Sequence, residues 1–222
     1  MSINLHIMTA GDPFPLEYER RLWAALDMAR QKIAPLLALD EVDVVVAAVP
    51  SAVIPRIGVN GFASTPNYLT LQIDPKREDL AADLDERLGA LLAHELHHCA
   101  RMRGPGYGQK LGERLVSEGL AECFEEEAGY PTPFYAVECS GEALRAFARQ
   151  AFERLERADL NFNDWMFGSR VSDAFPYQCG YSLGYAVVRQ WLAIAGRTPS
   201  EAARVEAGEV LTLWHRGAIK LV

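Results

Sequence analysis

The feature that most constrains this chain is a pair of histidines one helical turn apart in a leucine-striped segment. Apolar residues recur at helical spacing from about residue 75 to Arg103, at Leu80, Leu84, Leu88, Leu91 and Leu92. The motif His94-Glu95-Leu96-His97-His98 lies near the end of this stripe and matches H-E-x-x-H. Residues four apart share a helix face, so His94 and His98 can bind one Zn²⁺ together. The sequence therefore predicts a long, partly buried helix that supplies two ligands of a zinc site.

A catalytic zinc needs a third protein ligand, and a second predicted helix supplies a candidate. Ser117-Glu118-Gly119-Leu120-Ala121-Glu122 lies within a helix predicted from about Gln109 to Ala128. Only the turn 101–108 separates the two helices, so the second can fold back and bring Glu118 to the histidines. Gly119 beside Glu118 predicts the close approach of another element. The alternative is that Glu118 and Glu122 belong to a solvated acidic face.

The first half of the chain reads mainly as strands. Alternating or β-branched patterns predict strands at 3–7, 42–49 and 68–73, the last at the rim of a sheet, and a helical period predicts an amphipathic helix from Leu22 to Leu37. Asn60-Gly61 is a hairpin signal, and Thr65-Pro66-Asn67 is a second turn signal.

The second half reads as helices. After the helix that carries Glu118, apolar periodicity predicts three more, around 144–155, at 181–195 and at 201–214. Strands followed by helices indicate an α+β fold, with a small N-terminal sheet, a mostly helical C-terminal half and a cleft between them. We expect a single domain over residues 1–222, with sub-lobes of about 1–103 and 104–222.

Composition excludes several function classes. The chain has 22 Lys+Arg against 30 Asp+Glu, a formal charge of −8, which disfavours nucleic acid and anionic lipid as partners. No segment resembles a membrane span or a signal peptide, so we expect a cytoplasmic protein. The four cysteines form no C-x-x-C pair and are expected to be buried thiols.

Three motifs together resemble a known family. The helix with HExxH and the following Glu-Gly-x-x-Glu resemble the gluzincin metallopeptidases. The whole set, with Gly180-Tyr181-Ser182-Leu183-Gly184-Tyr185, resembles a bacterial family of predicted Zn-dependent proteases over roughly residues 56–195. This resemblance implies a zincin-like fold and a zinc hydrolase with one Zn²⁺ per chain.

The resemblance also implies roles for individual residues. His94 and His98 would be zinc ligands, Glu118 the third ligand, and Glu95 the general base that takes a proton from water at the zinc. Glu122, one turn after Glu118, would accept the free N–H of a ligand histidine. His97 is expected to be a flanking or substrate-facing residue and not a ligand.

Two tyrosines one turn apart are candidates for stabilising the oxyanion of the reaction. Tyr181 is favoured over Tyr185 because it lies nearer the start of its helix. The alternative is that both rings only pack in the core.

The sequence leaves two functional classes open. In the first, an endopeptidase-like enzyme binds a peptide or protein substrate by adding it as a strand at 68–73, with Tyr68, Thr70, Gln72 and Tyr185 in contact with the substrate. In the second, zinc only stabilises a binding or regulatory module without peptidase activity. Glu95 has no task in such a structural site, and structural zinc is usually held by four ligands rich in cysteine. The enzyme is therefore the favoured hypothesis.

Overall fold

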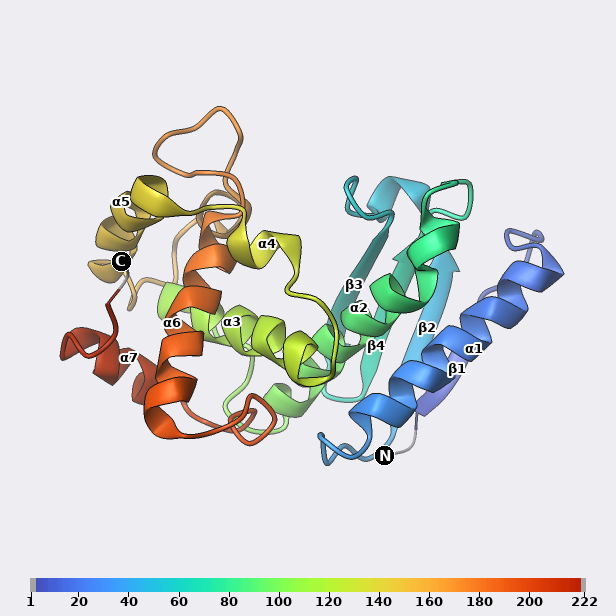
Figure 1. The fold of residues 1–222 in the computed structure, drawn as a ribbon, viewed down its shortest axis with the longest axis horizontal. Helices are drawn as coiled ribbons and strands as arrows, with labels where there is room; N and C mark the ends of the chain where they lie inside the picture. The colour runs from blue at the N-terminus through green and yellow to red at the C-terminus, as the bar shows by residue number, and fades with distance from the viewer. Residues whose placement is uncertain (1–2, 221–222) are drawn as a thin grey trace. The chain divides into compact units, whose positions relative to one another are not determined.

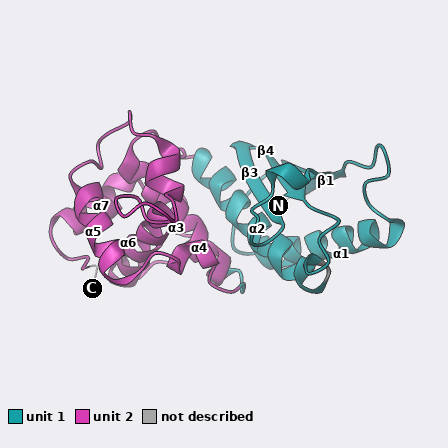
Figure 2. Cartoon of the chain, turned by 90° about the horizontal axis from the view of Figure 1, so that it is seen from above, with its two compact units in different colours: residues 1–102, 128–130 teal, residues 103–127, 131–222 magenta. Residues whose placement is uncertain are grey.

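The structure, a computed structural model, describes residues 3–220 of the chain. It divides into two compact units (Figure 2). Unit 1 comprises residues 1–102 and 128–130, and unit 2 comprises residues 103–127 and 131–222. The expectations of one domain and of a cleft between its halves stay predictions.

Unit 1 is built on a four-stranded sheet with helices on one face (Figure 1). Its strands lie in the order β1-β2-β4-β3, and their bounds are β1 (Ile3–Ile7), β2 (Val42–Ala48), β3 (Val59–Thr65) and β4 (Tyr68–Ile73). β1, β2 and β4 run parallel, and β3 is antiparallel to β4. The helices α1 (Leu16–Ile33) and α2 (Leu80–Met102) cover the sheet, and the short 3-10 helix η1 (Pro50–Ala52) follows β2. The three predicted strands are confirmed.

The structure corrects two expectations about this sheet. β4 is not a rim strand, because β2 pairs with one of its edges and β3 with the other. A peptide therefore cannot add to β4 as a further strand. Asn60-Gly61 is not a turn either, since both residues lie inside β3 and pair with Gln72 and Leu71. The turn at Pro66-Asn67 is confirmed as the link between β3 and β4.

Unit 2 is helical, which completes the predicted α+β class. Its helices are α3 (Leu111–Glu127), α4 (Phe134–Val137), α5 (Gly141–Phe152), α6 (Cys179–Ala195) and α7 (Ala207–His215), with a π-helical turn η2 (Asn163–Phe167) before α6. The last helix begins six residues later than predicted, because residues 201–204 form turns. These turns follow Ser200, whose backbone N–H and hydroxyl both donate to the carboxylate of Glu127. α4 and η2 were not predicted, since elements this short leave no periodic signal.

The central packing contact of unit 2 is the crossing of α3 and α6 (Figure 1). A Cβ on Gly119 would lie 2.2 Å from the carbonyl oxygen of Gly184, and a Cβ on Gly184 would lie 2.3 Å from that of Leu115. Both helices therefore need glycine where they meet. The prediction that Gly119 marks the close approach of another element is confirmed, and the second glycine of the Gly-Tyr-x-x-Gly-Tyr segment has a packing reason.

Two further expectations concern membrane-spanning helices and the cysteines. Within residues 3–220, each helix is too short or too polar to cross a bilayer. The four cysteines, at 99, 123, 139 and 179, are thiols, and all of them are buried. Burial is the largest cause that raises the pKa of Cys179 to about 12, so this thiol is protonated at neutral pH.

The helix crossing makes a stability prediction. Gly184→Ala places a methyl group against the backbone of α3, and we expect it to lower the free energy of unfolding by about 1–3 kcal/mol, the usual cost of overpacking. Urea denaturation would measure the change. Gly208→Ala in α7 is the matched control, because its Cβ would meet no atom within 4 Å and stability should hold or rise slightly. A Gly184→Ala protein as stable as the wild type would contradict the close crossing.

Candidate metal centre

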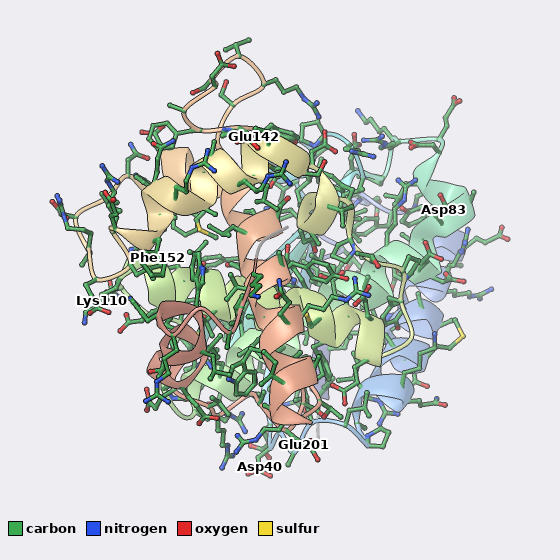
Figure 3. The ribbon with its side chains drawn as sticks, turned by 60° about the vertical axis from the view of Figure 1, so that its left-hand side comes forward. Asp40, Asp83, Lys110, Glu142, Phe152 and Glu201 are labelled. Carbon is green, nitrogen blue, oxygen red and sulfur yellow. The ribbon has the colours of Figure 1, made fainter. Side chains whose placement is uncertain are left out.

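The last turns of α2 are buried on every side. Charged side chains elsewhere, such as Asp83, Glu142 and Glu201, are exposed and point outward (Figure 3). All residues from 91 to 101 are buried, and this segment contains five polar or charged side chains, those of His94, Glu95, His97, His98 and Arg101. Burying such groups costs free energy unless they are hydrogen-bonded, paired or bound to a metal. The segment is therefore the strongest candidate for a functional site in unit 1.

The two motif histidines converge through their Nε2 atoms. His94 and His98 are 6% and 5% exposed, and their Nε2 atoms lie 3.0 Å apart. Two nitrogens on one tetrahedral zinc, with Zn–N bonds of about 2.0–2.1 Å, would lie about 3.3 Å apart. The separation of the two rings therefore suits a shared metal ion with little adjustment.

Glu118 joins the two histidines in a cluster that could hold a metal ion. It lies on α3 and is 4% exposed, so the alternative of a solvated face is wrong for this residue. One ligand atom each from His94, His98 and Glu118 lie within 4.8 Å of one another. Two imidazoles and a carboxylate are a donor set that zinc accepts, and three protein ligands leave a fourth position open.

Glu95 is held by the edge strand β3. The Ala63 N–H donates to Glu95 Oε2 at 2.7 Å, and a Cβ on Gly61 would lie 2.6 Å from Glu95 Cγ. Ala63 therefore directs its N–H toward Glu95, and Gly61 leaves room for the side chain. The glycine of the Asn60-Gly61 pair is therefore explained by this contact and not by a turn.

Sequence reasoning missed Tyr107, which lies in the loop between α2 and α3. Its hydroxyl donates a hydrogen bond to Glu118 Oε1, and its carbonyl oxygen accepts from Ser117 Oγ at 2.6 Å. Burial, followed by the negative charge of Glu118, raises the pKa of Tyr107 well above its usual value, so the hydroxyl remains a donor at neutral pH. In the sequence, Tyr107 stands only as a tyrosine between two glycines of a turn. No periodic pattern there predicts a contact with Glu118.

The other carboxylates of α3 are also buried or paired. Glu122 is 0% exposed one turn after Glu118, which excludes a solvated face; its role beside a ligand histidine stays a prediction. Glu125 accepts a hydrogen bond from Tyr135 Oη at 2.7 Å. The hydroxyl of Tyr185 contacts both carboxylate oxygens of Glu126, at 3.0 and 3.1 Å.

The two candidate tyrosines have different surroundings. Tyr185 is buried, and its hydroxyl contacts Glu126, two turns along α3 from Glu118; its contact with substrate stays a prediction. Tyr181 is partly exposed and packs edge-on against Tyr135, with ring centroids 5.5 Å apart. The oxyanion role of Tyr181 stays a prediction.

The remaining predicted residues lie as follows. His97 is 0% exposed, which argues against a substrate-facing role. Tyr68, Thr70 and Gln72 lie along the face of β4 that is not buried, and Gln72 Nε2 donates to Thr70 Oγ1 at 2.8 Å. Their assignment to substrate binding assumed a rim strand, and the interior position of β4 removes that reason.

Fold and site together define an α+β protein with a buried cluster of two histidines and one carboxylate that suits a metal ion. The model of the family described as Predicted Zn-dependent protease (DUF2268) matches residues 22–212, and the chain belongs to this family. The resemblance drawn from the three motifs is thereby confirmed.

One curated relative is itself uncharacterized. The protein YjfC of Bacillus subtilis (strain 168) is 28% identical over 171 residues, and the match covers 70% of this chain and 54% of YjfC. This chain therefore spans about half the length of that relative. No solved structure matches the chain significantly.

The ligand cluster predicts how metal content responds to mutation. We expect the purified protein to hold about one divalent metal ion per chain, and His94→Ala, His98→Ala and Glu118→Ala each to lose most of it, because each removes one ligand. Elemental analysis would measure the content. Glu95→Gln is the control on the same helix, since it keeps the shape of a residue outside the cluster and should retain the metal. Full occupancy in His98→Ala would contradict the assignment.

Proposed function

We propose that this protein is a zinc-dependent metallopeptidase of the gluzincin type. The observation that carries the proposal is the position of Glu95: it neighbours the buried ligand His94 on α2, and β3 holds its carboxylate through the Ala63 N–H. The family description supports zinc as the metal and proteolysis as the reaction. A site that only stabilised the fold would need neither an open position nor a carboxylate beside the ligands.

Each site residue has a task in this proposal. His94, His98 and Glu118 would hold the ion, and bound zinc supplies Lewis acidity that makes water nucleophilic near neutral pH. Glu95 would accept a proton from the attacking water and deliver it to the leaving amine. Tyr181 remains the candidate donor to the oxyanion.

The substrate strand belongs at β3 and not at β4. β3 is the last strand of the sheet, so one of its edges is not paired within the sheet. The Ala63 N–H donates to Glu95 Oε2, so the proposed base is in contact with β3, which supports this choice of strand. A peptide added along this edge would satisfy its own backbone and bring one peptide bond beside Glu95. The proposed substrate is therefore a peptide in an extended conformation.

The activity itself can be tested with a mixed peptide library. We expect the zinc-loaded protein to cleave internal peptide bonds, identified by mass spectrometry of the products. Glu95→Gln should keep the zinc and reduce turnover about 10²–10⁴-fold, because it removes the proton acceptor without removing a ligand. No cleavage at full zinc occupancy would favour the module without peptidase activity, and an active Glu95→Gln protein would exclude this mechanism.

Gly61 provides a steric test of the position of Glu95. Gly61→Ala places a methyl group 2.6 Å from Glu95 Cγ and forces the carboxylate to move. We expect turnover to fall up to about 10²-fold, the effect of a displacement near 1 Å, while metal content stays unchanged. Ser64→Ala on the same strand is the control, because Ser64 is exposed and turnover should be retained. Equal turnover of the two variants would remove Gly61 from the argument.

A further inference from the structure

Tyr107 donates a hydrogen bond from its hydroxyl to the carboxylate of Glu118. Its hydroxyl takes Oε1, and Glu118 is also the carboxylate of the metal-binding cluster. A hydrogen bond to a ligating carboxylate fixes the rotation of the carboxylate group, and with it the direction in which the group faces a metal ion. The contact with Tyr107 therefore limits the orientations open to the Glu118 carboxylate.

The loop that delivers this hydroxyl is fixed on both sides. Gly106 and Gly108 flank Tyr107 with φ of +88° and +102°, a left-handed backbone that glycine adopts readily. Ser117 Oγ donates to the carbonyl oxygen of Tyr107 at 2.6 Å. The Glu113 carboxylate accepts from the next two backbone N–H groups, those of Gln109 and Lys110, at 2.8 and 3.0 Å. α3 therefore holds the loop that in turn orients a carboxylate of α3.

We propose that Tyr107 is a positioning residue for the metal: its hydroxyl holds Oε1 of Glu118 and thereby fixes the orientation in which this carboxylate faces the ion. Hydrogen bonds from residues around a ligand commonly set its orientation and the metal affinity. This inference rests on the proposed metal site but not on peptidase activity.

Metal binding by Tyr107→Phe tests the inference directly. We expect its zinc affinity, measured by competition with a chelator, to fall about 10- to 100-fold, the usual cost of losing such a hydrogen bond. Cobalt(II) substitution gives the second readout. The visible absorption spectrum of the cobalt protein should change, because a Glu118 carboxylate released from Tyr107 can bind the ion in more than one orientation.

Tyr135→Phe is the matched control. Tyr135 donates to Glu125 on the same helix at 2.7 Å, so this variant also deletes one tyrosine hydroxyl from a buried carboxylate of α3. Glu125 lies outside the ligand cluster. We expect zinc affinity and the cobalt spectrum to stay within about twofold of the wild type. A fall in this variant as large as in Tyr107→Phe would mean that only general packing is measured, and would overturn the inference.

A double-mutant cycle separates action through Glu118 from any other effect. In a Glu118→Ala background, removing the Tyr107 hydroxyl should weaken the residual zinc binding no further, because the carboxylate that accepts its hydrogen bond is already gone. Additive losses would overturn the inference, as would wild-type affinity and spectrum in Tyr107→Phe.

If Tyr107→Phe does not fold, the substitution Ser117→Ala tests the same loop. Ser117→Ala removes the hydrogen bond to the Tyr107 carbonyl and should lower zinc affinity in the same direction, whereas unchanged affinity would overturn the inference. Zinc binding without peptide cleavage would contradict the proposed function alone. Zinc binding that does not depend on Tyr107 would contradict this inference alone.

Discussion

Burial of charged and polar side chains on two consecutive helices is the constraint on which the rest of the structure depends. α2 buries His94, His98 and Glu95, and α3 buries Glu118 and Glu122, all at 6% exposure or less. Such groups are tolerated only with a metal, a hydrogen bond or an opposite charge as partner. Several partners are visible: the Ala63 N–H for Glu95, the Tyr107 hydroxyl for Glu118, and the convergence of two imidazoles with a carboxylate. The side chains whose burial must be compensated are therefore the same ones to which the proposed chemistry is assigned.

Glycines make these arrangements possible by bringing backbones close. Gly119 and Gly184 let α3 and α6 cross with almost no space between them, one residue after Glu118 and three after Tyr181. Gly61 leaves room for Glu95 against β3. At these positions a single methyl group would collide with backbone or with the carboxylate. Packing therefore explains Gly119 and Gly184, and the proposed chemistry is assigned to the residues near them, Glu118 and Tyr181.

Hydroxyl donors around α3 distinguish its carboxylates from one another. Glu118, Glu125 and Glu126 are contacted by Tyr107, Tyr135 and Tyr185, and only Glu118 belongs to the ligand cluster. In sequence these glutamates look alike, as members of one acidic helix. Their tasks differ because the residues that contact them come from separate segments, namely a loop, a four-residue helix and α6.

The sequence by itself determined the class of fold, the long helices and the core of the site. HExxH at 94–98 places two candidate ligands side by side, because a helix puts residues four apart on one face. The short connection to α3 and the Glu-Gly pair then pointed to Glu118. Tertiary structure alone decided that β4 is an interior strand and that Asn60-Gly61 lies in a strand beside Glu95. It also decided that the hydroxyl of Tyr185 contacts Glu126 and that the hydroxyl of Tyr107 contacts Glu118. Each of these depends on which segment lies beside which, and strand order and loop contacts leave no periodic trace along the chain.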